Sequence, residues 1–135
     1  MRIVLDTNVF VSSFFGGKPK EIIRLWTRSE VILCISPAIM EEYIVVVRRL
    51  GLDKRPELDE LLALFKRSHS TCFSAAVPEL HVVTADPEDD KFIACAVELK
   101  AKAIVSGDHH LLELGTYIDI PILSPSEFLH KHCAR

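Results

Sequence analysis

A carboxylate, a hydroxyl and an amide follow one another directly after the first apolar segment of the chain. Residues 2–5 read Arg-Ile-Val-Leu, and Asp6, Thr7 and Asn8 come next. Side chains that follow a buried strand in this way point into one crevice at its carboxyl end. The alternative for Asp6 alone is a turn role, because Asp and Asn side chains readily bond to nearby backbone.

Three more acids occur where later strands are expected to end or the following helices to begin. They are Glu42, Asp90 and Asp108. Together with Asp6 they form a set of carboxylates that would repel one another in a cleft unless cations neutralised them. Oxygen ligands without Cys or ordered His spacing favour hard ions, so the set predicts Mg²⁺ or Mn²⁺. Such an ion activates water for attack on phosphorus, which is the chemistry of phosphodiester hydrolysis.

Helical geometry separates Glu42 from its neighbour Glu41. In a helix over residues 37–50 the bulky apolar residues form one stripe, which is expected to face the core: Ile39, Met40, Tyr43, Val46, Val47 and Leu50. Glu41 lies nearly opposite this stripe and is predicted to be solvated, whereas Glu42 lies at its flank. The pattern therefore favours Glu42 as the acid that reaches the sheet. Ile44 and Val45 lie off the stripe and suggest a dimer surface.

An acidic run, Asp86-Pro87-Glu88-Asp89-Asp90, precedes the apolar residues of a helix expected at about 89–100. Acids in a first turn interact favourably with the helix dipole, and this structural role is the alternative for all of them. Asp90 lies three residues ahead of Ile93, on the face most closely linked to the core. It is the best candidate to point inward, with Asp89 as the competing ligand.

Asp108 follows Ser106-Gly107 at the end of an apolar segment and precedes two histidines, His109 and His110. Gly107 permits a close approach of backbone at this point. Capping of a short helix is the alternative role for Asp108. Adjacent residues on a helix point about 100° apart, so solvated or capping roles are predicted for the two histidines.

The elements that must position these residues alternate between two hydrophobic periods. Continuous β-branched segments predict buried strands at 2–5, 31–35, 103–106 and 120–123. Helical patterns, several opened by proline, lie between them at 19–28, 37–50, 56–67, about 89–100, 108–114 and 125–131. Residues 69–83 are expected to contain connection plus one edge strand. The alternation predicts an α/β three-layer sandwich with a central parallel sheet, in which ligands bind at the carboxyl ends of the strands.

Length and composition predict one domain over residues 1–135, since 49% of the residues are hydrophobic and 26% are charged. No apolar run approaches the roughly 20 residues of a membrane span, so the expected location is the cytoplasm. The four cysteines stand singly and are predicted to be reduced thiols. A net charge of -3 argues against binding of nucleic acid through a broad basic face.

In this ordered set of motifs the chain resembles the PIN-domain nucleases. The matching pieces span nearly the whole chain: Leu5-Asp6-Thr7-Asn8-Val9, Ser36-Pro37 through Glu42-Tyr43, Asp86 through Ala96, and Val105 through Leu112. The resemblance implies a Rossmann-like PIN fold, Mg²⁺- or Mn²⁺-dependent endoribonuclease activity and a homodimer. It also implies metal-binding, and hence catalytic, roles for Asp6, Glu42, Asp90 and Asp108, with Thr7 and Asn8 supporting the first carboxylate.

The end of the chain, residues 122–129, is similar to that of a PIN subgroup described as toxin components of type II toxin–antitoxin pairs, related to the VapC-like toxins. This likeness implies a cognate antitoxin as a protein partner. The chain departs from the pattern at His110, where many relatives carry a second acid. The departure leaves open whether the site holds one metal ion or two.

A row of basic residues offers a way for an acidic pocket to take RNA. Lys20, Arg24 and Arg28 fall four apart on the helix expected at 19–28, and such a row can contact phosphates of single-stranded or looped RNA. An ordinary solvated helix face is the alternative. The leading hypothesis is therefore a metal-dependent endoribonuclease, and the competing one is a catalytically weak or inactive PIN-like module that binds RNA or protein.

Overall fold

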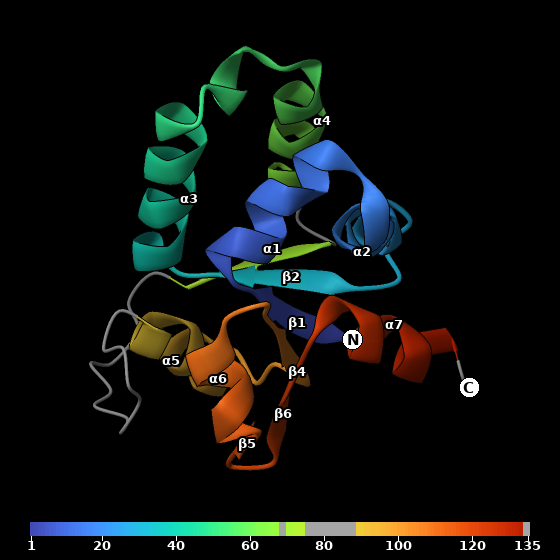
Figure 1. Ribbon diagram of the computed structural model, residues 1–135, viewed down its shortest axis with the longest axis vertical. Helices are drawn as coiled ribbons and strands as arrows, with labels where there is room; N and C mark the ends of the chain where they lie inside the picture. The colour runs from blue at the N-terminus through green and yellow to red at the C-terminus, as the bar shows by residue number, and fades with distance from the viewer. Residues whose placement is uncertain (68–69, 75–88, 134–135) are drawn as a thin grey trace.

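The computed structural model describes residues 1–67, 70–74 and 89–133, which form a sheet with helices on both faces (Figure 1). In chain order its strands are β1 (Arg2–Leu5), β2 (Ile32–Ile35), β3 (Thr71–Phe73), β4 (Ala103–Val105), β5 (Thr116–Tyr117) and β6 (Ile120–Leu123). The α-helices are α1 (Thr7–Ser12), α2 (Gly17–Thr27), α3 (Pro37–Arg49), α4 (Pro56–Phe65), α5 (Asp90–Glu98), α6 (His109–Leu114) and α7 (Pro125–Cys133). Two short 3-10 helices, η1 (Ser13–Phe15) and η2 (Leu52–Lys54), precede α2 and α4.

The strand order is β3-β2-β1-β4-β6-β5. All neighbouring pairs from β3 to β6 are parallel, whereas β5 runs antiparallel to β6. The chain moves outward from β1 through β2 to β3 and then returns to the other side of β1 at β4. The strand order therefore reverses between β1 and β4, and open α/β sheets bind their ligands outside the carboxyl ends of the strands at such a reversal.

The reversal also decides which helices cover which face of the sheet. Right-handed crossovers place α1 to α4 on one face, because the chain there moves in one direction across the sheet, and α5 and α6 on the other (Figure 1). Helix α7 packs against α2. The central strands are buried, as Ile3–Leu5, Leu33–Ile35 and Ala103–Val105 are each at most 1% exposed.

The predicted elements are confirmed, with strand ends within one residue and helix ends within two. The predicted edge strand is β3, at the border of the sheet. Capping explains this agreement at α3, where the Ser36 hydroxyl accepts a hydrogen bond from the backbone N–H of Ile39 at 3.3 Å and Pro37 begins the helix. Trp26 and Tyr43 lie in the core, each 1% exposed.

Helix α1 and strand β5 are absent from the sequence prediction, because six and two residues are too few to show a hydrophobic period. The prediction was also wrong about Leu50, which was placed on the buried stripe of α3. Leu50 is 53% exposed. The helix ends at Arg49 and the backbone turns at Gly51, whose φ of 71° is left-handed.

The cysteines whose side chains are described, Cys34, Cys72 and Cys95, are free thiols, as predicted. Burial raises the pKa of Cys34 and of Cys95 to about 12. Both are therefore uncharged and unreactive near neutral pH. None of the helices in the described ranges is long and apolar enough to cross a bilayer.

Candidate metal centre

Asp6 lies at the carboxyl end of β1, beside the point where the strand order reverses. Its backbone N–H continues the pairing with β4 by donating to the Val105 carbonyl at 3.0 Å. Its side chain caps α1, because Oδ1 accepts a hydrogen bond from the N–H of Val9 at 2.8 Å. Only 3% of the residue is exposed. The strand, the cap and the burial together hold this carboxylate in one orientation.

Burial raises the pKa of Asp6 above its ordinary value of 3.8, and the nearby Asp108 carboxylate adds to the rise. Hydrogen bonds from Ser106 and from the backbone of Val9 and Gly107 act in the opposite direction but do not cancel it. Within the described residues no Lys or Arg forms an ion pair with Asp6 or Asp108. The charged form of Asp6 therefore lacks a neutralising cation from this part of the chain.

Ser106 connects the ends of the two central strands. Its hydroxyl, which is fully buried, donates to Asp6 Oδ2 and accepts a hydrogen bond from the Asp108 N–H at 2.8 Å. Asp108 in turn caps α6, with Oδ1 accepting from the N–H groups of His110 at 2.8 Å and Leu111 at 3.3 Å. The capping role that was the alternative for Asp108 is thus present, and its predicted role as a metal ligand stays a prediction. Sequence reasoning missed Ser106, although a serine ending a buried apolar strand was a visible signal.

Glu42 reaches the same edge of the sheet from α3. Its Oε2 accepts a hydrogen bond from the Thr7 hydroxyl, and its Oε1 pairs with the Lys91 ammonium at 2.7 Å. The two side chains of this ion pair are 27% and 19% exposed. Glu41 is exposed, so the helical angle separated the two glutamates correctly. Lys91 was not singled out from the sequence, because its partner lies 49 residues away.

Tyr43 fixes α3 against the first strand. Its hydroxyl donates to the carbonyl of Leu5, the last residue of β1, and its ring stacks on Phe10 of α1 with centroids 4.1 Å apart. Burial raises the pKa of this phenol well above its ordinary value, so the hydroxyl keeps the proton that it donates. This contact positions Glu42, the neighbouring residue, beside Thr7.

The acids that precede α5 and α6 approach each other. Asp89, Asp108 and His110 each offer a ligand atom, and these atoms all lie within 4.8 Å of one another. No other group of three or more His, Cys, Asp or Glu residues in the described ranges meets this distance. The predicted set of Asp6, Glu42, Asp90 and Asp108 is thus not gathered this closely, although it shares one edge of the sheet.

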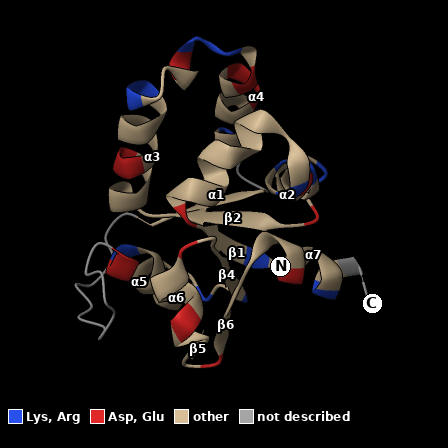
Figure 2. Cartoon of the chain, in the orientation of Figure 1, with Lys and Arg blue, Asp and Glu red and all other residues tan. Residues whose placement is uncertain are grey.

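The remaining predicted residues at this edge differ in burial. Asp89 is 7% exposed and precedes α5, whereas Asp90, the first residue of α5, is partly exposed. Thr7 is buried and bonds to Glu42, and Asn8 is exposed on α1. Asp86 and Glu88 lie outside the described residues. Figure 2 shows acidic segments at the starts of α1, α5 and α6 and on α3.

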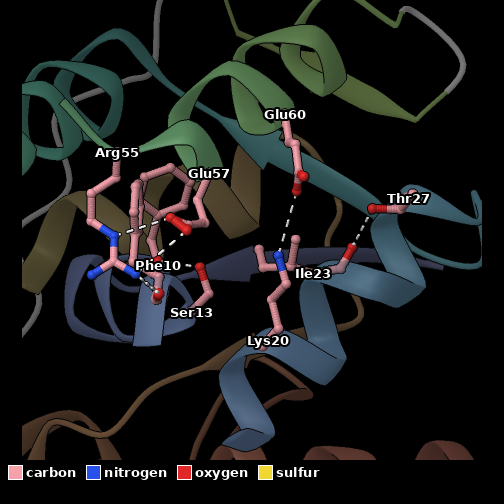
Figure 3. A network of polar contacts seen from close by, with 9 residues as sticks. Phe10, Ser13, Lys20, Ile23, Thr27, Arg55, Glu57 and Glu60 are labelled. Atoms are coloured by element: carbon pink, nitrogen blue, oxygen red, sulfur yellow. Dashed lines mark hydrogen bonds and ion pairs between the residues drawn. The ribbon is translucent and has the colours of Figure 1, made fainter. Parts of the chain in front are cut away.

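The predicted basic row runs away from these acids. Lys20 pairs with Glu60 of α4 at 3.6 Å, as Figure 3 shows, and Arg28 pairs with Glu30 at 3.9 Å. Arg24 is exposed between them. Because Arg28 precedes β2, it lies near the amino ends of the parallel strands, opposite the acidic edge. Of the three residues, the one nearest the start of α2, Lys20, lies closest to the candidate site.

An apolar groove of about 450 Å³ lies between α3 and α4, apart from the acidic edge. Met40 and Ile44 of α3 and Leu58 and Leu62 of α4 contribute to its walls. Ile44 is 42% exposed and Leu62 is 46% exposed. The groove offers apolar contact but few groups able to hold a metal or a phosphate.

The donor set at the acidic edge fits a divalent cation. It offers buried or partly buried carboxylate oxygens and one imidazole nitrogen. Burial, and to a smaller extent the Asp108 carboxylate, raises the pKa of Asp6, and a cation would favour its charged form. A mostly parallel sheet with helices on both faces and this possible metal site at its reversal point defines a Rossmann-like α/β protein.

The family within this class follows from sequence comparison. A family model described as PIN domain matches residues 2–110, and the chain therefore belongs to the PIN-domain family. No curated protein matches the chain with significant similarity. PIN domains are generally metal-dependent nucleases, so the family indicates nucleic acid as the substrate class. The matched range includes every acid of the candidate site.

Proposed function

We propose that this chain is an endoribonuclease that hydrolyses RNA phosphodiester bonds with the help of Mg²⁺ or Mn²⁺, and that residues 1–135 form one such domain. The observation that carries the proposal is the connection of Asp6, Ser106 and Asp108 at the reversal point of a PIN-domain sheet. One buried hydroxyl thus bonds both the carboxylate of Asp6 and the backbone of Asp108, and this places the two aspartates where one ion can be ligated by both.

The proposed ligands are Asp6, Asp108 and Glu42, with Asp90 or its neighbour Asp89 completing the set. A bound divalent ion supplies a water of lowered pKa and charge that stabilises the transition state and the leaving oxygen. Three of these ligands are oriented by hydrogen bonds. The Ser106 hydroxyl orients the Asp6 carboxylate, the N–H groups of His110 and Leu111 orient that of Asp108, and the Thr7 hydroxyl orients that of Glu42.

Basic residues near the start of α2 are the proposed RNA contacts. Lys20 and Arg24 lie closer than Arg28 to the carboxyl ends of the strands, since α2 runs antiparallel to β1 and leads to the amino end of β2. A localised contact of this kind suits a single-stranded RNA phosphate and agrees with a net charge of -3.

The biological role proposed for this nuclease is that of the toxin of a type II toxin–antitoxin pair, acting in the cytoplasm as a homodimer and inhibited by a cognate antitoxin. Support comes from the VapC-like sequence at residues 122–129. The exposed apolar residues Ile44 and Val45 on α3 are the proposed dimer contact, being 42% and 53% exposed. Sedimentation of the protein with and without Ile44→Glu tests this contact, and an unchanged monomer in both contradicts it.

The nuclease proposal is tested with the full chain and a fluorescent single-stranded RNA. Asp6→Asn and Asp108→Asn should abolish cleavage in Mg²⁺ and in Mn²⁺, because an amide keeps the capping hydrogen bond but loses the charge. Asp119→Asn is the matched control, since Asp119 is exposed in a turn with φ 65°, a conformation that Asn tolerates. Circular dichroism checks that all variants fold. Cleavage at the wild-type rate by both site variants would refute these acids as the catalytic site, and a wild-type protein that cleaves no RNA would be an inactive module that binds RNA or protein.

The toxin role needs a separate experiment in a bacterial host. Induced expression of the wild-type chain should arrest growth, and Asp108→Asn should not. Coexpression of a small protein encoded directly upstream should restore growth and copurify with the chain. If the wild-type protein cleaves RNA but its expression does not slow growth, the proposed nuclease activity stands and the proposed toxin role is refuted.

A further inference from the structure

We propose that His110 supplies a nitrogen ligand to the metal site and makes it select Mn²⁺ and later first-row ions over Mg²⁺. This inference rests on the proposed function, because it concerns the same site. Its basis is the cluster in which ligand atoms of Asp89, Asp108 and His110 lie within 4.8 Å of one another. An ion with ligands about 2.1 Å away holds opposite ligands about 4.2 Å apart, so small side-chain rotations suffice to close the site.

The first turn of α6 holds His110 at this position. Asp108 Oδ1 accepts the N–H of His110 at 2.8 Å, so the backbone of the histidine is tied to a carboxylate of the same cluster. No hydrogen bond to Asp108 Oδ2 is found in the described part of the chain, and this oxygen is the one available to a cation. Asp89 approaches from the residue before α5 and is 7% exposed. Three side chains from two separate segments thus converge on one point.

The neighbouring histidine takes a different direction. His109 pairs with Glu113 of the same helix at 2.8 Å, and its side chain is 80% exposed. Both imidazoles on α6 are exposed, but His109 pairs with an acid of its own helix, whereas His110 approaches Asp89 and Asp108. This difference gives the site an internal control, because replacing His109 removes the same chemical group from outside the cluster.

The replacement of an oxygen ligand by an imidazole changes which cation is preferred. Mg²⁺ takes oxygen ligands almost entirely and keeps several waters. Imidazole suits first-row transition ions, whose affinity for mixed nitrogen and oxygen sites rises from Mn²⁺ through Co²⁺. Two carboxylates and one imidazole form such a mixed set. The protein should therefore discriminate against Mg²⁺ more strongly than its own His110→Asp variant does.

The test measures metal binding by the full chain without reference to cleavage. Pulsed electron paramagnetic resonance of bound Mn²⁺ should show nitrogen hyperfine coupling in the wild type and in His109→Asn but not in His110→Asp. Displacement of Mn²⁺ by Mg²⁺ gives the ratio of the two affinities. Loss of a ligand should lower the preference for Mn²⁺ at least about tenfold in His110→Asp, with His109→Asn unchanged.

Each other outcome has a defined meaning. Mn²⁺ binding that depends on Asp6 but shows no nitrogen coupling and no change in His110→Asp would overturn the role of His110 and leave the proposed nuclease intact. Loss of the nitrogen coupling in His109→Asn would identify His109 as the ligand and would also overturn the proposed role of His110. A wild-type protein that binds neither ion would refute both this inference and the proposed function.

Discussion

Asp6 and Glu42 face the same edge of the sheet but have different electrostatic surroundings. Glu42 has the Lys91 ammonium 2.7 Å from Oε1. Among the described residues the donors to Asp6 are uncharged, the Ser106 hydroxyl and the backbone N–H of Val9 among them. Burial raises the pKa of Asp6, which means that these hydrogen bonds do not fully offset the loss of water.

The difference indicates where a cation is needed most. Hydrogen-bond donors orient a carboxylate and offset part of the desolvation of its charged form, and a nearby positive charge can compensate what remains. On the Glu42 side a lysine from α5 supplies this charge. On the Asp6 side the described residues supply none, and Asp108 lies near enough to raise the pKa further. A divalent ion should therefore bind chiefly on the Asp6 side. Glu42 should ligate this ion only when its ion pair with Lys91 is broken.

The largest expected effect is on Mn²⁺ affinity, when the negative charge of Asp6 or that of Glu42 is removed. Replacing a supporting group around a metal site lowers affinity about 10- to 100-fold, so loss of a direct ligand in Asp6→Asn should weaken Mn²⁺ binding at least about 100-fold. Glu42→Gln, which removes a carboxylate already neutralised by Lys91, should weaken it only about tenfold. Calorimetric titration of the three proteins measures both losses. Equal losses would remove the distinction between the two sides.

A second effect is a pH dependence that arises from the raised pKa of Asp6. In the metal-free protein the raised pKa means that the folded state binds this proton more tightly than the unfolded chain does. The resulting stability is fully present below about pH 3.8, the ordinary pKa, and is lost as pH rises through the raised value. Mn²⁺ competes with the same proton, so stabilisation by Mn²⁺ should grow over that window.

The measurement is the shift in Tm caused by Mn²⁺ between about pH 4 and about pH 7, in the wild type and in Asp6→Asn. The variant lacks the titrating carboxylate, so its metal-free stability should not fall over the window as that of the wild type does. Glu42→Gln should keep the wild-type dependence. A Mn²⁺ effect in the wild type that is constant with pH contradicts the assignment of the raised pKa to the metal-binding carboxylate.

The fold could be predicted wherever its signals are local to the backbone. Ser124 shows this at α7, where its hydroxyl accepts the N–H of Glu127 at 3.1 Å and Glu127 accepts the N–H of Ser124 at 3.0 Å. A capping serine could likewise be predicted at Ser36, whose hydroxyl caps α3. Helix α1 escaped prediction because it has only six residues and because its capping residue, Asp6, equally fits a ligand.

The site could be predicted less fully, because its contacts join distant segments. Helical angle was enough to prefer Glu42 over Glu41, which the structure leaves exposed. The same counting could not place Asp89, since this residue precedes the first helical turn of α5. The hydrogen bond from Ser106 to Asp6 spans 100 residues. Such a contact depends on which strands become neighbours in the sheet. The pattern of nearby residues in the sequence does not determine strand order.

The smallest expected effect concerns Lys91 and has a matched control in Lys20, which pairs with Glu60 at 3.6 Å (Figure 3). Both ion pairs join two helices, but the glutamate of the Lys20 pair is 72% exposed and that of the Lys91 pair 27%. Lys91→Gln should therefore lower the free energy of unfolding by about 1 kcal/mol and Lys20→Gln by less than about 0.5 kcal/mol. Chemical denaturation measures both.

Metal binding then separates the two lysines more sharply than stability does. Removing the ammonium beside Glu42 takes away a charge that repels a divalent ion and frees a carboxylate to ligate it, so Lys91→Gln should bind Mn²⁺ a few-fold more tightly. Lys20→Gln should bind it as the wild type does. If Lys91→Gln binds Mn²⁺ more weakly, the lysine supports the site instead of competing with the ion. The Asp6 side and the Glu42 side of the acidic edge would then form a single metal-binding site.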